Sequence, residues 1–406
     1  MTIGTIDLTD PDAFVRGDHH EMFRRLRAHD PVHHHPSPYG AFWALTRYED
    51  VQAAYLDNTV LLSSGGAMLG GSYRNEADTA AGRMLVSTDS PRHRQLRQLM
   101  YPAFHSELAE RCQRQVTTLV NDAVDAALRD GGCDFATTIA WELPAGVLMA
   151  MMGIGRSDAH ALISMTRRMI GFRDPAYQRT TDDERLYLAA VQSEIFEFFF
   201  DLIQERRHRP GDDLVGLLAT ARLNGRPLSD EDIVFNCMNA AVGGNETTSH
   251  TMSAGVIALM EHPEQHQALL SDPGLLDTAI NEMLRWASTN AYVQRVAAHD
   301  VEIGGRLIRA GDSVTLWNVS ANRDPTQFAD PDRFDLGRTP NRHLSFGSGP
   351  HRCIGAALAT MEMTVLLRRV IADRIRFTPA GDAQRTRSNF ILGVNHLPVH
   401  MTRSGS

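Results

Sequence analysis

The residues from about Ser229 to Glu261 predict a single helix, and this segment constrains the fold more than any other. It opens with Ser229-Asp-Glu-Asp232, a polar group suited to capping the amino terminus of a helix. At 1.5 Å per residue, its roughly thirty residues would span about 45 Å, enough to cross a whole domain. Two adjacent glycines in its middle, Gly243 and Gly244, each cost about 1 kcal/mol relative to alanine. The pair allows either close helix packing through small residues or the approach of a flat cofactor and a diatomic ligand to the backbone.

The rest of the chain predicts further helices and a smaller amount of strand. The 406 residues contain no long linker, low-complexity tract or internal repeat, so we expect one large domain over residues 1–406. The fold class is predicted as mainly α with a minor β region. The helical parts are expected at about 90–286 and 353–373, and the β-richer parts at about 31–60, 290–345 and 385–401. Two strands that pair with each other are expected around Phe390 to Met401. Within the β-rich stretch, Gly304 and Gly305 indicate a hairpin turn.

The chain contains no lysine, so all 40 of its basic residues are arginine. This excludes pyridoxal phosphate enzymes, which need a lysine for the Schiff base, and P-loop proteins, which need one for the phosphates. The formal net charge of −9 makes general binding of nucleic acid or of anionic membranes unfavourable.

The amino-terminal residues and the cysteines indicate a cytoplasmic protein. The four cysteines have no paired spacing, which favours a reduced setting. Residues 1–14 are acidic and lack the basic and apolar regions of a signal peptide. The longest apolar stretch, Ala145 to Ile154, is about half as long as a bilayer-spanning helix and predicts a buried one.

The segment from Phe346 to Gly355 reads Phe-Gly-Ser-Gly-Pro-His-Arg-Cys-Ile-Gly and carries the clearest chemistry. Its glycines permit unusual backbone conformations and leave space around the sulfur of Cys353. A helix is predicted to begin near this cysteine, so its dipole and free N–H groups would favour the thiolate. A thiolate among backbone N–H groups suits an axial metal ligand. The simpler interpretation is a buried cysteine beside a turn. A hydrolase using His351 is disfavoured, because residues two apart at a helix start point in different directions.

The spacing of Phe346, Gly349, His351, Cys353 and Gly355 resembles the haem-binding loop of the cytochrome P450 family. By that resemblance, Cys353 is the proximal thiolate ligand of the haem iron, Phe346 packs beneath the porphyrin and His351 contacts a haem propionate. The resemblance extends over about residues 10 to 400. It implies the P450 fold, with haem b (iron protoporphyrin IX) between the long helix and the loop and helix that carry the cysteine.

His93 and Arg97 are four residues apart, which places them on one face of a predicted helix. Ser90 is expected to cap this helix, with Pro91 as its first residue. On their own such pairs are usually solvated, but an arginine fork can also clamp carboxylates. The family resemblance implies that both residues bind the haem propionates. Arg295 matches another arginine of the family that binds a propionate.

Two more motifs resemble those of the family. Ala241-Val-Gly-Gly-Asn-Glu-Thr-Thr248 resembles its oxygen-binding motif, which places Gly243 and Gly244 at the haem. By the same resemblance, Glu246 and Thr247 are the acid–alcohol pair that delivers protons during oxygen activation.

Glu282-Met-Leu-Arg285 resembles the Glu-x-x-Arg motif of the family, which is structural rather than catalytic. The motif is completed by a later arginine. We assign Arg333 to that third position.

The resemblance implies a monooxygenase that inserts one atom of O2 into a C–H or C=C bond of a mostly apolar small molecule. Electrons are expected from NAD(P)H through a separate reductase and a ferredoxin or flavodoxin, because the chain has no flavin, nicotinamide or iron–sulfur segment. One alternative is a peroxygenase or a non-oxygenase with the same haem, which the intact Glu246–Thr247 pair disfavours. Another is a haem-binding sensor without turnover, and no regulatory domain supports it.

Substrate and partner surfaces follow from the same resemblance. The Gly/Ser/Ala-rich residues 63–81 are predicted to form a lid. The substrate is expected above the haem, bordered by the 63–84 loop and by Ala240, Gly243, Thr289, Asn290, Tyr292, Val293, Ile391 and Leu392. The redox partner is expected to dock through Arg92, Arg94, Arg342 and Arg352. The chain resembles actinobacterial tailoring enzymes. Hydroxylation or epoxidation of a polyketide, terpenoid or peptide in antibiotic biosynthesis is therefore expected, with the substrate free or carrier-bound and the enzyme monomeric.

Overall fold

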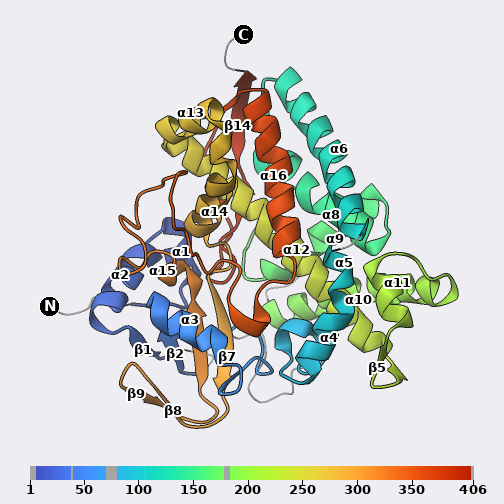
Figure 1. The fold of residues 1–406 in the computed structure, drawn as a ribbon, viewed down its shortest axis with the longest axis vertical. Coiled ribbons are helices and arrows are strands. Elements are labelled where there is room, and N and C mark those ends of the chain that lie inside the picture. Colours follow the sequence, from blue (N-terminus) through green and yellow to red (C-terminus); the bar gives the residue numbers. More distant parts are fainter. Residues whose placement is uncertain (1–5, 38–39, 70–79, 106, 178–182, 404–406) are drawn as a thin grey trace.

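The computed structural model describes residues 6–37, 40–69, 80–105, 107–177 and 183–403. The long helix predicted from the sequence is α12 (Asp230–Glu261), which has 32 residues. As expected, Ser229 caps it, because the Ser229 hydroxyl accepts a hydrogen bond of 3.1 Å from the N–H of Asp232. Figure 1 shows α12 running through the interior of the helical part, and it packs against α8, α9, α10, α14 and α16.

Most of the chain is helical, and the helices surround α12. They are α1 (Pro11–Arg16), α2 (His19–His29), α3 (Tyr48–Leu56), α4 (Arg92–Met100), α5 (Pro102–His105), α6 (Glu107–Arg129), α7 (Phe135–Thr138), α8 (Glu142–Met152), α9 (Arg156–Ile170), α10 (Glu184–His208), α11 (Leu214–Thr220), α13 (Pro263–Ser271), α14 (Leu276–Ala287), α15 (Asn318–Ala321) and α16 (Ala356–Ala372). The apolar faces of α4 to α14 and of α16 form one continuous core, to which α6, α8 and α12 contribute many of the buried side chains, whereas α1, α2, α3 and α15 pack in two smaller clusters with strands of the main sheet. The prediction of a mainly α fold with a minor β region is confirmed.

The main sheet has five strands in the order β1-β2-β10-β7-β3 and lies to one side of the helices (Figure 1). Its strands are β1 (Val32–His35), β2 (Phe42–Leu45), β3 (Leu61–Leu62), β7 (Tyr292–Ala297) and β10 (Ser313–Trp317). The smaller sheets use β4 (Gly132–Asp134), β5 (Arg222–Leu223), β6 (Arg226–Pro227), β8 (Val301–Ile303), β9 (Arg306–Ile308), β11 (Ile375–Pro379), β12 (Gln384–Arg385), β13 (Val394–His396) and β14 (Pro398–Arg403). The predicted hairpin at Gly304 and Gly305 is confirmed, since β8 and β9 pair on either side of it.

Three local predictions differ from the structure. Ser90 does not cap α4, which begins at Arg92 with no side-chain cap. The carboxyl-terminal strands do not pair with each other: β13 pairs with β12, and β14 pairs with β11 and β4. The helix after Cys353 begins at Ala356, three residues later than predicted, and Gly355 is its N-cap residue.

One window, Phe135–Met152, is long and apolar enough by composition to cross a membrane. It is interrupted between α7 and α8, and 72% of it is buried inside the protein. These are the features of core helices, in agreement with the buried helix expected around Ala145.

Candidate active site

A cavity lies between α12 and the segment from Ser345 to Met363, which holds the cysteine loop and the start of α16. Its empty volume is about 1540 Å³, including its opening. Elements far apart in the chain meet here. Among the residues of its wall are Tyr55, Leu85, Val86, His93, Arg97, Ala240, Gly243, Gly244, Thr247, Thr248, Thr289, Asn290, Val293, Arg295, Phe346, His351, Cys353, Gly355 and Glu362.

The two glycines of α12 face this cavity. A Cβ atom placed on Gly243 or Gly244 would meet no atom of the described chain within 4 Å. Close packing of another helix therefore does not explain the pair. What remains of the two sequence-based explanations is the approach of a bound group to the helix backbone.

We expect Gly243→Ala to leave thermal stability unchanged or to raise it by up to about 1 kcal/mol, because alanine favours the helix. The same methyl group should weaken the binding of a cavity-filling azole to the haem-loaded protein several-fold. Gly255→Ala is the matched control on the same helix. Its Cβ would lie 2.8 Å from the sulfur of Met283, so it should lower stability and leave azole binding unchanged. A Gly243→Ala variant that loses stability and keeps azole affinity would contradict this assignment.

The cysteine loop is held open by its backbone. Gly347 and Gly349 have φ values of +65° and +67°, in the left-handed region that favours glycine. A Cβ on Gly349 would also lie 2.7 Å from the carbonyl oxygen of Tyr55 on α3. The N–H of Cys353 donates a 2.9 Å hydrogen bond to the carbonyl of Phe346, which closes the loop. The side chain of Cys353 is thereby exposed into the cavity.

The free thiol of Cys353 is less acidic than the sequence suggested. Desolvation raises its pKa above the ordinary value, while the N–H of Gly355 and the charges of Arg97 and Arg352 lower it only in part. The helix dipole acts from a greater distance than predicted, because α16 begins three residues beyond the cysteine. A metal ion bound by Cys353 would supply the missing stabilisation of the thiolate, since coordination deprotonates a thiol outright.

Four basic side chains gather on one wall: His93, Arg97, Arg295 and His351. The rings of His93 and His351 stack with centroids 3.8 Å apart, and Nε2 of His93 is buried without a hydrogen-bond partner. Desolvation and, to a lesser extent, neighbouring cations together lower the pKa of His93 to about 4 and that of His351 to about 3. Burial also lowers the pKa of both arginines.

The carboxylate nearest to this cluster, Asp89, is already engaged. It accepts hydrogen bonds of 2.7 and 3.1 Å from the backbone N–H groups of Ser63 and Ser64. The cluster is therefore short of anions, and two carboxylates of a bound group would supply them. A haem with its propionates here and its iron at Cys353 fits these residues.

The predicted acid–alcohol pair is divided between two faces of α12. Thr247 faces the cavity, and its hydroxyl donates a 2.7 Å hydrogen bond to the carbonyl of Gly243. Glu246 is buried on the other side, where it accepts from Thr166 at 2.9 Å and Asn245 at 3.1 Å. His250 Nε2 lies 3.4 Å from the Glu246 carboxylate. Because His250 Nδ1 accepts the N–H of Val394, its Nε2 carries the proton and points it at Glu246.

Glu362 of α16 is a wall residue that the sequence analysis did not select. Its side chain is buried, one carboxyl oxygen has no hydrogen-bond partner, and the side chain of Thr248 lies near the carboxyl group. Burial raises its pKa well above the ordinary value, more than Thr248 lowers it. In the sequence, the feature that could have identified Glu362 is its position as a single carboxylate within the apolar stretch after Cys353.

Of the predicted substrate residues, Ala240, Gly243, Thr289, Asn290 and Val293 line the cavity. Tyr292 does not: it is buried on the other side of β7, where its hydroxyl accepts the N–H of Leu69 at 3.1 Å. Ile391 pairs with Asn290 through the backbone but does not reach the cavity, and Leu392 lines a different pocket.

The predicted lid lies partly outside the described residues, which exclude 70–79. Its described parts, 63–69 and 80–84, do not line the cavity, whereas the following Leu85 and Val86 do. Of the 63–84 loop expected to border the substrate, these described parts therefore lie outside the cavity wall.

The Glu-x-x-Arg pair is confirmed, but its third member is corrected. Glu282 and Arg285 form a fully buried bidentate pair with two hydrogen bonds of 2.8 Å. The side chain that joins them is Arg338, whose Nε lies 3.1 Å from Glu282. Arg333 is exposed and contributes only its carbonyl oxygen, to Arg285 and Arg338.

This network supports the cysteine loop. Asn322 lies within it, because its carbonyl accepts from Arg285 at 2.9 Å. Its side chain accepts the N–H of Leu344 and donates to the hydroxyl of Ser345. The Ser345 hydroxyl in turn bonds to the carbonyl of Leu284 on α14. The start of the loop is thus tied to the helix that carries the ion pair.

Comparison with known proteins agrees with this geometry. The family model for cytochrome P450 matches residues 19–393. The chain is 33% identical to linalool 8-monooxygenase of Pseudomonas putida, over 97% of this chain and 98% of that protein. It is 34% identical to cytochrome P450 NovI of Streptomyces niveus, over 98% and 96% of the two chains. Cytochrome P450 CYP268A2 of Mycobacterium marinum, solved in complex with pseudoionone, superposes with a TM-score of 0.90 at 33% identity. The match covers 98% of this chain and 99% of that one.

The match covers nearly the whole chain, and its fold implies haem, O2 and electrons from external redox partners. The protein belongs to the cytochrome P450 family and is a cytochrome P450 monooxygenase.

Proposed function

We propose that this protein uses haem b, held by Cys353, to insert one oxygen atom from O2 into a C–H or C=C bond of a mostly apolar small molecule. The observation that carries the proposal is the single cavity with Cys353 on one wall and Gly243 and Thr247 on another. When bound, the thiolate-ligated haem supplies the oxygen-activating chemistry, because thiolate ligation favours O–O cleavage.

The residues of the chain divide the remaining work. Arg97 and Arg295 would neutralise the haem carboxylates, His93 and His351 would orient them through hydrogen bonds, and Phe346, Gly349 and Gly355 shape the loop that carries Cys353. Thr247 holds a proton at the cavity face of α12, and Glu246 lies one residue away on the buried face. The carbon monoxide difference spectrum of the reduced protein tests the assignment directly. A red-shifted Soret band supports thiolate ligation, and a spectrum typical of histidine ligation would refute it.

Thr247→Ala should retain the haem spectrum and divert reducing equivalents into hydrogen peroxide, with product per electron pair falling several-fold. The variant removes the hydroxyl proton at the cavity wall while the helix stays intact. Thr220→Ala is the matched control, because Thr220 makes the same bond to the carbonyl four residues back on α11, outside the cavity. The assay measures peroxide and product together. A Thr247→Ala variant that forms as much product per electron pair as the wild type would contradict a role of Thr247 in proton delivery.

The substrate is proposed to be a small, branched, largely apolar molecule of terpenoid or polyketide type, or a peptide, free or carrier-bound. The apolar side chains of Leu85, Val86, Ala240 and Val293 support an apolar ligand, and Thr289 and Asn290 offer a few hydrogen bonds. Linalool and pseudoionone, in the names of two similar proteins, are small unsaturated molecules of this kind. Hydroxylation or epoxidation in antibiotic biosynthesis is consistent with the similarity to NovI. A substrate-induced spin-state shift would identify members of the class.

Electrons are proposed to come from NAD(P)H through a reductase and an acidic ferredoxin or flavodoxin. The enzyme itself is proposed to be monomeric and cytoplasmic and to bind neither nucleic acid nor membrane. Arg94, Arg342 and Arg352 are exposed on or near the elements that carry the cysteine loop and α4. Arg92 is less available, because it pairs with Asp232 at 2.9 Å.

Arg342→Glu should slow reduction of the haem by the redox partner several-fold and make the reduction rate less dependent on salt. The reason is that charges at the edge of a docking interface act mainly on the association rate. Arg306→Glu, a comparably exposed change on the β8–β9 hairpin, should leave the rate unchanged. Stopped-flow reduction across a salt series measures both. Rates that do not change with salt in the wild type would contradict docking through these arginines.

A further inference from the structure

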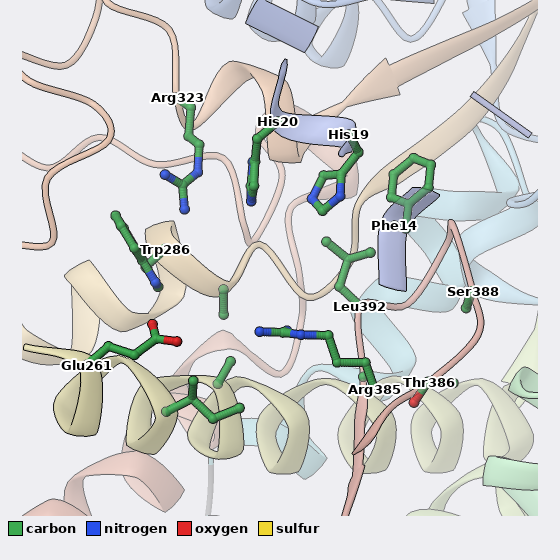
Figure 2. Close-up of a pocket in the computed structure, with 14 residues that line it drawn as sticks. Phe14, His19, His20, Glu261, Trp286, Arg323, Arg385, Thr386, Ser388 and Leu392 are labelled. Carbon is green, nitrogen blue, oxygen red and sulfur yellow. The ribbon is translucent and has the colours of Figure 1, made fainter. Parts of the chain in front are cut away.

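A second pocket lies further along α12, toward its carboxyl-terminal end, with an empty volume of about 620 Å³ including its opening (Figure 2). Five parts of the chain enclose it: the carboxyl-terminal half of α12, the end of α14, the region of α1 and α2, the segment Arg385–Gly393, and Arg323 just after α15. The wall consists of Phe14, His19, His20, Ala254, Ile257, Glu261, Trp286, Ala287, Arg323, Arg385, Thr386, Ser388, Leu392 and Gly393. It shares no residue with the cavity at Cys353.

Arg385, an exposed residue, brings a positive charge to the mouth of this pocket. Among the described residues, its side chain forms no ion pair or hydrogen bond, although its backbone pairs in β12. Figure 2 shows its guanidinium extending along α12 into the space beneath His19 and His20. A guanidinium in this position presents a fork of donors that matches a carboxylate.

Arg323 adds a second charge on the opposite side. It is only 8% exposed, its guanidinium carbon lies 4.0 Å from the ring centroid of Trp286, and it pairs with Asp332 at 3.0 Å. Burial lowers the pKa of Arg323 to about 10, more than Asp332 raises it, so the group remains charged at neutral pH. The stacked Trp286 and Arg323 form a flat, cationic side of the pocket.

His19 is the clearest sign of a missing ligand. It is 4% exposed, and neither of its ring nitrogens has a hydrogen-bond partner. The carbonyl of Ala13 is near enough to raise its pKa slightly but is not in hydrogen-bond geometry. Burial, together with the charges of Arg323 and Arg385, lowers the pKa of His19 to about 4, so the ring is neutral and has one N–H to donate. Buried polar groups are rarely left unpaired, and an acceptor in the pocket would satisfy this one.

The remaining wall limits what the acceptor can be. Phe14, Ile257 and Leu392 are apolar and would cover a hydrocarbon or aromatic body. Glu261 contributes a negative charge at one edge, which disfavours a dianion such as phosphate. The chemistry that fits is one carboxylate attached to an apolar group.

We propose that this pocket binds a small organic monocarboxylate, with its carboxylate between Arg385 and His19 and its apolar body against Phe14, Ile257 and Leu392. The site is separate from the haem cavity, but the two share a wall. The N–H of Leu392 donates a 2.8 Å hydrogen bond to the carbonyl of Thr289, and Thr289 lines the haem cavity.

The test uses 4-fluorobenzoate and the haem-loaded protein, with imidazole on the iron to block the other cavity. Fluorine NMR titration should give saturable binding, and the uncharged 4-fluorobenzamide should bind at least ten-fold more weakly. Arg385→Gln should weaken 4-fluorobenzoate binding at least ten-fold. The affinity of Arg385→Lys for 4-fluorobenzoate should lie between those of the wild type and Arg385→Gln. Arg114→Gln, at an arginine side chain that is 68% exposed on α6, is the matched control and should bind as the wild type does.

A second variant separates loss of the site from loss of the fold. Ala254→Phe should fill the pocket and abolish binding while the imidazole-bound haem spectrum is unchanged. The proposal is overturned if 4-fluorobenzoate does not bind at millimolar concentration, if the amide binds equally well, or if Arg385→Gln or Ala254→Phe leaves the affinity unchanged.

Discussion

Cys353→Ser is expected to abolish the red-shifted Soret band of the reduced carbon monoxide complex and to reduce product formation to background. A serine hydroxyl is a far weaker acid than a thiol and does not provide the soft anionic ligand that favours O–O cleavage. The loop itself should survive. Its closing hydrogen bond uses the backbone N–H of residue 353, and its turns depend on Gly347 and Gly349. The loss would therefore be chemical rather than structural.

The control for this experiment is Cys133→Ser. Cys133 is partly buried on β4 beside the sulfur of Met401, 3.9 Å away, and does not line the haem cavity. This variant should keep both the spectrum and the activity. Circular dichroism and haem content, measured on both proteins, separate ligand loss from unfolding. A Cys353→Ser protein that retained the red-shifted band would show that another residue holds the iron.

Glu282→Ala should destabilise the protein by about 3–5 kcal/mol, because it leaves a buried arginine without its counter-charge. Glu282 accepts hydrogen bonds from Arg285, Arg338, Asn341 and the N–H of Asp335, and its side chain is fully buried. The same bonds tie α14 to the loop before Cys353. The variant should therefore lose haem as well as stability, measured by thermal unfolding and by haem absorbance per protein.

Two arginine variants test which side chain completes the network. Arg338→Ala should be clearly destabilising, because its guanidinium is largely buried between Glu282 and three backbone carbonyls. Arg333→Ala should change stability by no more than about 0.5 kcal/mol, as for an ordinary surface substitution. The reverse order of effects would restore Arg333 to the role first assigned to it.

Much of the site was predictable because its parts have local signals. The glycine pair, the cysteine loop and the His93–Arg97 spacing each occupy a short segment, and their geometry follows from the local backbone. The structure brings them to one cavity as expected. The division of Glu246 and Thr247 between two faces follows from helix periodicity, since consecutive residues point about 100° apart.

The residues that were misplaced depend on tertiary register. Tyr292 and Val293 are neighbours on β7, so their side chains point to opposite faces and only one can line the cavity. The sequence does not say which. Arg333 and Arg338 lie in the same irregular segment, where no periodicity indicates which guanidinium turns inward. Leu392 lies beyond a loop whose path is set by contacts with Thr289 and Asn290.

The left-handed glycines of the cysteine loop bear on how this enzyme can be engineered. At Gly349 a side chain is opposed both by the backbone conformation and by the Tyr55 carbonyl, so nearly every substitution should be rejected by the fold. The facing wall, around Val86, Ala240 and Val293, consists of side chains from separate elements with no such backbone constraint. Directed evolution of substrate preference should therefore sample the facing wall freely, while a library that randomises the loop would consist mostly of inactive clones.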